Sequence, residues 1–118
     1  MSSYPRPFGI SVAPGLDGAV LIRVQGELDM SSSPELDQIL RREIAAGRQV
    51  VVDLSQTAFI DSTGLNALVT ALRAADSNGG ELKLSPTLPA QVERVLEITG
   101  LNKVLPLGTE SADTTATK

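Results

Sequence analysis

The chain has 118 residues, which suits one domain with a buried core and is too short for two. Hydrophobic residues make up 42% and aromatic residues only 3%, so aliphatic side chains must supply the core. The net charge of −4 opposes binding to a phosphate backbone, and the low aromatic content removes the surfaces on which single-stranded bases stack. We therefore expect no nucleic-acid partner.

The chain contains neither cysteine nor histidine. The lack of cysteine excludes disulfides and thiolate metal sites, and it suits a reducing compartment. The lack of histidine excludes a Ser-His-Asp hydrolase and the usual zinc sites. Paired aspartates alone are weak evidence for acid-base catalysis or a magnesium site, so we expect no enzyme and no bound metal. No apolar run approaches the roughly 20 residues that cross a bilayer, which favours a cytoplasmic protein without membrane contact.

The first part of the chain predicts a hairpin followed by a helix. Residues 1–7 are small, polar and proline-rich, so we expect a flexible N-terminus. Strands are predicted for Phe8–Val12 and Ala19–Val24, and the proline-glycine turn between them favours antiparallel pairing. A helix is predicted from about Pro34 to Ala46, because proline is favoured at the first helical position and the preceding serine would cap it.

The rest of the chain alternates strands and helices. The unbroken apolar run Val50–Leu54 is typical of a strand buried on both faces, at the centre of a parallel sheet. The later predicted elements are a helix at Ser62–Ser77, a strand at Glu81–Ser85, a helix from residues 86–89 to Gly100, a strand at Val104–Leu107, and a disordered tail at 108–118. Right-handed crossovers then give a mixed, mostly parallel sheet of about five strands, with the N-terminal strand antiparallel at one edge.

Polar residues follow two of these strands. Asp29 comes after the second strand, and Asp61 with Ser62 comes after the third. If both strands run parallel, their loops emerge at the same edge of the sheet. Two interpretations stay open: Asp61 or Ser62 is only a helix cap, or Ser62 is a phosphate acceptor at a helix start that favours negative charge. Asn66 lies on the solvated helix face beside this serine, where a partner would dock.

Two motifs together carry a family signal. They are Gly26-Glu27-Leu28-Asp29 ahead of a helix, and Val51-Val52-Asp53-Leu54 followed by Phe59-Ile60-Asp61-Ser62-Thr63-Gly64-Leu65. With these motifs the chain resembles the STAS-domain anti-sigma-factor antagonists of bacteria over residues 8–107. The resemblance implies a single α/β STAS domain with helices packed mainly on one face of the sheet. The segment 108–118 lacks the amphipathic helix with which family members commonly end.

The resemblance also implies a function. In that family the serine after the aspartate, here Ser62, is phosphorylated by an anti-sigma factor that is an ATP-dependent serine kinase, and a metal-dependent phosphatase reverses the step. The unphosphorylated antagonist binds the anti-sigma factor and frees a sigma factor. The kinase supplies ATP and magnesium, so no cofactor of its own is expected. The implied partner-binding residues are Asp29, Asp61, Thr63, Gly64 and Asn66. The alternative is a STAS scaffold in a signalling or transport assembly that is not switched.

Overall fold

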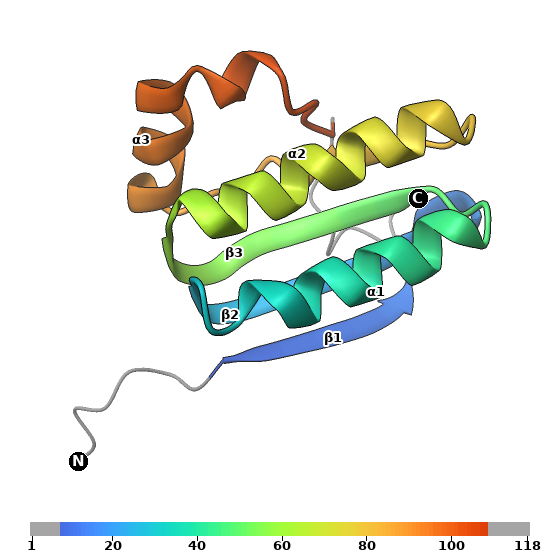
Figure 1. The fold of residues 1–118 in the computed structure, drawn as a ribbon, viewed down its shortest axis with the longest axis horizontal. Coiled ribbons are helices and arrows are strands. Elements are labelled where there is room, and N and C mark those ends of the chain that lie inside the picture. The colour runs from blue at the N-terminus through green and yellow to red at the C-terminus, as the bar shows by residue number, and fades with distance from the viewer. Residues whose placement is uncertain (1–7, 109–118) are drawn as a thin grey trace.

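The centre of the molecule is a mostly parallel β-sheet with one antiparallel edge strand (Figure 1). The computed structural model describes residues 8–108. Within that range four strands form one sheet in chain order, with β1 antiparallel to β2 and the other pairs parallel. They are β1 (Gly9–Pro14), β2 (Val20–Leu28), β3 (Val50–Ile60) and β4 (Leu82–Leu84). The predicted α/β fold with an antiparallel N-terminal edge strand is confirmed.

Two long helices lie on the same face of the sheet, α1 (Ser33–Ala45) and α2 (Ser62–Ser77) (Figure 1). A shorter helix, α3 (Ala90–Thr99), lies at the end of the molecule where α2 begins. Two single 3-10 turns, η1 (Leu16–Gly18) and η2 (Leu101–Lys103), complete the elements of the described range. The β2–α1–β3 and β3–α2–β4 units are the crossovers that parallel strands require.

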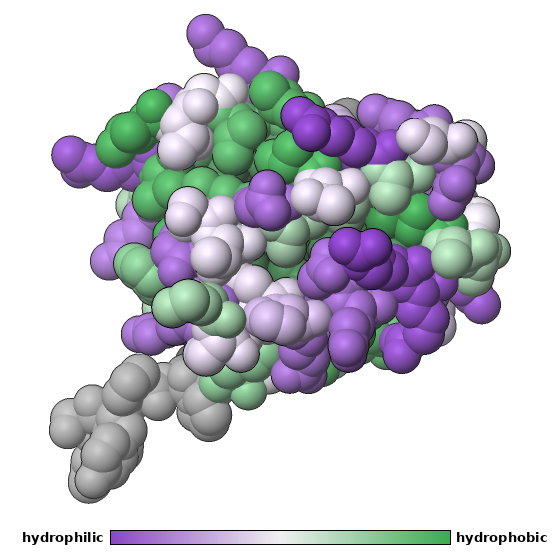
Figure 2. All heavy atoms as spheres, viewed as in Figure 1, coloured by the Kyte–Doolittle hydropathy of each residue, from purple (hydrophilic) through white to green (hydrophobic). Residues whose placement is uncertain are grey.

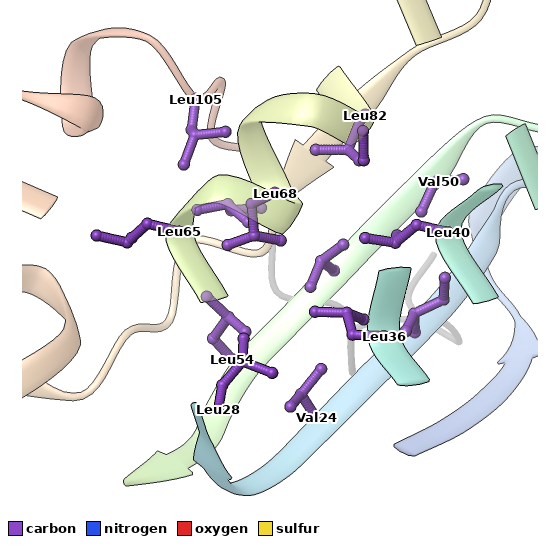
Figure 3. Close-up of a cluster of buried hydrophobic side chains, with 14 of the residues drawn as sticks. Val24, Leu28, Leu36, Leu40, Val50, Leu54, Leu65, Leu68, Leu82 and Leu105 are labelled. Carbon is purple, nitrogen blue, oxygen red and sulfur yellow. The ribbon is translucent and has the colours of Figure 1, made fainter. Parts of the chain in front are cut away.

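The core between sheet and helices is aliphatic, as the composition predicts (Figure 3). The central strand β3 contributes Val50, Val52 and Leu54, each no more than 1% exposed. Leu36 and Leu40 of α1 are fully buried against them. Burying one such side chain stabilises the fold by about 1.5–3 kcal/mol, so the run that predicts the central strand also anchors both helices.

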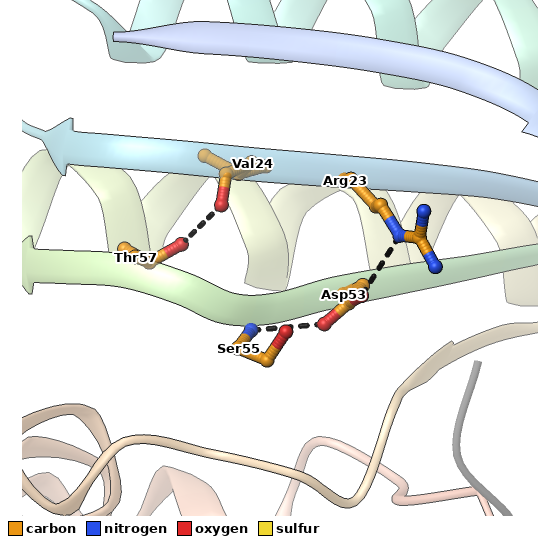
Figure 4. Close-up of polar contacts among 5 residues, drawn as sticks. All are labelled: Arg23, Val24, Asp53, Ser55 and Thr57. Carbon is orange, nitrogen blue, oxygen red and sulfur yellow. Dashed lines mark hydrogen bonds and ion pairs between the residues drawn. The ribbon is translucent and has the colours of Figure 1, made fainter. Parts of the chain in front are cut away.

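Both central strands run further than predicted. β3 continues past Leu54 to Ile60, and β2 continues past Val24 to Leu28. Thr57, a buried polar residue of the extension, finds its partner on the neighbouring strand: its hydroxyl donates to the Val24 carbonyl oxygen at 2.8 Å (Figure 4). The register shifts twice along this pairing, and each shift places an extra β3 residue in a bulge. As a result β2 and β3 end level with one another.

The predicted strand Val104–Leu107 is reduced to a single bridge. Leu107 pairs in parallel with Leu84 alone, because η2 occupies the preceding residues and Pro106 has no N–H to donate. The Leu84 N–H donates to the Pro106 carbonyl oxygen at 2.8 Å, and the Gly108 N–H donates to the Leu84 carbonyl oxygen at 2.7 Å. The predicted flexible N-terminus at 1–7 and the tail beyond Gly108 lie outside the described residues.

Candidate functional site

The start of α2 is capped by an aspartate. Asp61 has an extended backbone, and its Oδ1 atom accepts hydrogen bonds from the Thr63 N–H at 2.9 Å and the Gly64 N–H at 3.2 Å. The same oxygen also accepts a hydrogen bond from the Thr63 hydroxyl, with 2.6 Å between the two oxygen atoms. The two backbone N–H groups are among those that the first turn of a helix leaves without intrahelical partners. Of the two residues considered for the cap, the structure therefore assigns that role to Asp61.

Ser62 is the first residue of α2 and is exposed. Its hydroxyl group makes no hydrogen bond with any residue from 8 to 108. Because Asp61 already holds the first N–H groups of the helix, Ser62 is not required to cap it. A free hydroxyl at a helix start is accessible to a reagent brought by another protein.

Asp29 organises the loop between β2 and α1. Its Oδ1 atom accepts hydrogen bonds from the Ser31 hydroxyl at 2.7 Å and the Ser31 N–H at 3.0 Å. The Ser32 hydroxyl donates to the Glu27 carbonyl oxygen at 2.7 Å and accepts from the Asp29 N–H at 2.9 Å. The serine expected to cap α1, Ser33, does not do so, and neither serine provides a side-chain cap. The Ser32 hydroxyl instead holds the loop, and the Ser33 hydroxyl points to α2, where it bonds Thr63.

The two loops meet at one edge of the sheet. The Asp61 N–H donates to the Leu28 carbonyl oxygen at 3.1 Å, and the hydroxyls of Ser33 and Thr63 are hydrogen-bonded at 3.3 Å. The structure thus brings Asp29, Asp61 and Ser62 to the same edge, as parallel strands require. The Ser33–Thr63 contact was not predicted, because nothing in the local pattern of either loop points to the other.

Both aspartates of the site are held in the ionised form. The Ser31 hydroxyl, followed by the Ser31 N–H, lowers the pKa of Asp29 below its ordinary value. The Thr63 hydroxyl is the largest cause that lowers the pKa of Asp61, while burial and, to a smaller extent, the Asp29 charge oppose this shift. At neutral pH the edge therefore carries two negative charges.

The remaining predicted site residues divide by burial. Gly64 is buried, and a Cβ atom added to it would lie 2.8 Å from Leu28 Cγ and 2.9 Å from Ile60 Cγ1. The close packing of α2 on the ends of β2 and β3 therefore explains why residue 64 is a glycine. Asn66 is exposed one turn beyond Ser62, on the same helix face. Partner contact by these residues stays a prediction.

The surroundings of Ser62 are acidic and partly apolar. Segments 24–40 and 54–72 contain five carboxylates, Glu27, Asp29, Glu35, Asp37 and Asp61, and no lysine or arginine. Two exposed apolar side chains lie near this edge, Met30 of the loop before α1 at 75% exposure and Phe59 near the end of β3 at 48%. The sequence pattern did not predict that either would be exposed. Figure 2 shows strongly hydrophilic side chains over α1 and over part of α2, with paler ones where α2 begins.

The described part of the chain contains no group of three or more acidic, histidine or cysteine side chains that could hold a metal ion. None of its helices has the length and apolar character needed to cross a membrane.

Comparison with known proteins identifies the family. A model of the STAS domain matches residues 11–114. An anti-sigma-B factor antagonist of Staphylococcus aureus (strain NCTC 8325 / PS 47) is 36% identical over 85 residues, covering 71% of this chain and 78% of that protein. An anti-sigma F factor antagonist of Paenibacillus polymyxa is 29% identical over 94 residues, covering 76% and 78%. The crystal structure of an anti-sigma factor antagonist from Mycobacterium paratuberculosis matches with a TM-score of 0.76 and 28% identity, covering 87% and 86%.

The chain belongs to the STAS domain family. The relatives described above are named as anti-sigma factor antagonists, so the resemblance drawn from the two motifs is confirmed.

Substitution of Gly64 tests the packing at the helix start. We expect Gly64→Ala to lower the free energy of unfolding by about 1–3 kcal/mol, because the new methyl group meets Leu28 and Ile60 within 3.0 Å. Urea denaturation followed by circular dichroism measures the change. Gly80→Ala is the control, since its Cβ would meet nothing closer than 3.5 Å. Equal stability of the two variants would contradict the packing role.

The Asp61 cap predicts a dependence of stability on acid pH. Because the pKa of Asp61 is lowered by folding, its contribution is complete above the unfolded pKa of about 4 and is lost as the pH falls through the folded value. Asp61→Asn keeps an oxygen that accepts hydrogen bonds but does not titrate, so its stability should fall less steeply between pH 5 and pH 2, by the same linkage.

Urea denaturation at a series of pH values measures this slope for Asp61→Asn and the native chain. Asp76→Asn removes the same charge from the other end of α2 and serves as the control. Parallel pH profiles for the native chain and Asp61→Asn would exclude a contribution from the cap carboxylate.

Proposed function

We propose that this anti-sigma factor antagonist binds an anti-sigma factor that is also a serine kinase, and that phosphorylation of Ser62 switches this binding off. The observation that carries the proposal is the exposed, unbonded Ser62 hydroxyl beside a separate cap residue at the meeting point of two loops. In the unphosphorylated state the complex holds the anti-sigma factor and leaves a sigma factor free for transcription. The relatives named as antagonists of anti-sigma factors support this role.

The proposed chemistry is one phosphoryl transfer. The Ser62 Oγ atom attacks the γ-phosphorus of a magnesium-bound ATP held by the partner, a new O–P bond forms, and the bond to the bridging oxygen of ADP breaks. The hydroxyl proton passes to a base of the partner. A metal-dependent phosphatase reverses the modification with water, which releases inorganic phosphate and restores the serine hydroxyl. The chain supplies only the acceptor, so it needs no cofactor and is not an enzyme.

The phosphate would change the surface without remodelling the fold. It adds a charge of about −1.5 to −2 at neutral pH, which the N-terminal end of a helix tolerates locally. The N–H groups of Thr63 and Gly64 are already bonded to Asp61, so they do not shelter the new charge. The flanking segments 24–40 and 54–72 offer no lysine or arginine either.

In the proposed switch, this arrangement would weaken binding of the partner. A partner that covers Ser62 must remove water from the phosphate, and the carboxylates of Asp29 and Asp61 repel it. Another protein of this fold, SpoIIAA, has been solved in an unphosphorylated and a phosphorylated form, with TM-scores of 0.70 and 0.66 to this chain. Because the kinase and phosphatase act on ATP and phosphoproteins, we place the switch in the cytoplasm.

Phosphorylation of Ser62 is tested with the anti-sigma factor that co-purifies with the chain. Incubation of the purified pair with Mg-ATP should add one phosphate to the native chain, and tandem mass spectrometry should locate it at Ser62. Ser62→Ala should bind the anti-sigma factor but gain no phosphate. Ser62→Asp should bind at least about tenfold more weakly, the factor that corresponds to 1.4 kcal/mol.

Two outcomes would contradict this function. An unmodified native chain, or phosphate found elsewhere only, would exclude Ser62 as the acceptor. Binding that is unchanged by phosphorylation and by Ser62→Asp would instead support the alternative, a STAS scaffold that is not switched.

The acidic edge predicts a salt-dependent association. Asp29→Asn should slow association with the anti-sigma factor, and the difference from the native chain should shrink as salt rises from about 50 to 500 mM, because screening weakens charge interactions. Asp76→Asn is the matched control, since it removes the same charge from an exposed position at the other end of α2. Surface plasmon resonance measures both rates. An equal effect of the two variants would rule out a specific contribution of Asp29.

A further inference from the structure

Five hydroxyl side chains stand at the edge that carries the candidate site, and they are not equivalent. They belong to Ser31, Ser32, Ser33, Ser62 and Thr63. The Ser31 hydroxyl donates to Asp29 at 2.7 Å, and the Ser32 hydroxyl donates to the Glu27 carbonyl oxygen at 2.7 Å. Of the five, Ser62 alone has a hydroxyl without a hydrogen bond to any residue between 8 and 108.

Thr63 deserves comparison with Ser62 because it is adjacent and also exposed. A hydroxyl group can donate one hydrogen bond, and at 2.6 Å the Thr63 hydroxyl donates it to the Asp61 carboxylate, which can only accept. The Ser33 hydroxyl, at 3.3 Å from the Thr63 oxygen, must then be the donor of that pair. The hydrogen bonds therefore run from the Ser33 hydroxyl to the Thr63 hydroxyl, and from the Thr63 hydroxyl to the Asp61 carboxylate.

This chain of hydrogen bonds joins three elements. Ser33 begins α1 and is only 5% exposed, Thr63 lies in the first turn of α2, and Asp61 caps that helix. The bond to the carboxylate is of the charge-assisted kind, which is shorter and stronger than a bond between neutral groups. Each bond polarises the next, so the Thr63 oxygen is held on both sides.

We infer that the hydrogen bonds of Thr63 to Asp61 and Ser33 withhold its hydroxyl from the kinase. Phosphorylation is thereby directed to the neighbouring Ser62. This inference rests on the proposed function and concerns the choice between two adjacent acceptors. To react, the Thr63 hydroxyl would have to break the bond to Asp61 and weaken the cap of α2. Ser62 reacts without breaking any bond within residues 8–108.

The ratio of phosphate on Thr63 to phosphate on Ser62 tests this inference within one sample. Tandem mass spectrometry after reaction with the anti-sigma factor and Mg-ATP gives the ratio, which is insensitive to any general loss of kinase binding. Asp61→Asn keeps a cap but replaces the charged acceptor, and we expect it to raise the ratio roughly fivefold, as weakening one such hydrogen bond would. Ser33→Ala, at a buried position, should raise the ratio in the same direction. Ser31→Ala is the control and should leave it unchanged.

A second readout examines the hydrogen-bond chain in the isolated protein. Thr63→Val removes the donor that contributes most to the lowered pKa of Asp61, so the carboxyl pKa should rise in an NMR titration. Thr63→Ser restores a hydroxyl and should return the pKa toward the native value. Thr70→Val changes an exposed threonine further along the same helix and should leave the Asp61 pKa where it is.

The outcomes separate this inference from the function on which it rests. Absence of phosphate from the native chain would overturn the proposed function and this inference together. Phosphate on Ser62 with an unchanged ratio in both Asp61→Asn and Ser33→Ala would overturn the inference alone. An Asp61 pKa that Thr63→Val does not raise would also overturn it, because the hydroxyl would then not be held by the carboxylate.

Discussion

The site depends on the hydrogen bonds that the Asp61 carboxylate accepts at the start of α2. One of its oxygen atoms accepts from two backbone N–H groups and from the Thr63 hydroxyl, and this fixes where α2 begins. The helix that begins there contributes Leu65 and Leu68 to the core. Ser62, the residue directly after the cap, is exposed at the helix start, and its hydroxyl makes no hydrogen bond within residues 8–108.

That cap stands beside Asp29 only because β2 and β3 end together. Between the paired ends Val20–Val50 and Leu28–Ile60, β3 uses two residues more than β2, and two bulges absorb the excess. An unbulged β3 would carry Asp61 roughly 7 Å further along, since a strand rises about 3.3 Å per residue. The Thr57 hydroxyl, which lies between the two shifts, bonds the Val24 carbonyl oxygen across the strands. A polar residue inside the strand thus takes part in the irregular pairing that brings the strand ends level.

Features set by local pattern could be predicted, and features set by contacts between distant residues could not. The apolar run from Val50 and the bounds of helix Ser62–Ser77 follow from burial and helical spacing, and both are present in the structure. The extension of β3 beyond Leu54 was missed, because its polar residues pair with a strand about 30 positions away. The Ser33–Thr63 hydrogen bond was missed for the same reason, because its two residues are also 30 positions apart. The motif around Ser62 located the site, but which residue caps the helix needed three-dimensional contacts.

Separation of the cap from the acceptor has a consequence for switching. If Ser62 were itself the cap, a phosphate on its oxygen would compete for the hydrogen bonds that begin α2, and modification would change stability along with charge. With Asp61 as the cap, those bonds are made by a residue other than the proposed acceptor. In the proposed switch, the negative charge added at Ser62 would therefore act mainly on the partner that docks against this edge. An antagonist built in this way could alternate between two binding states while its core and sheet remain the same.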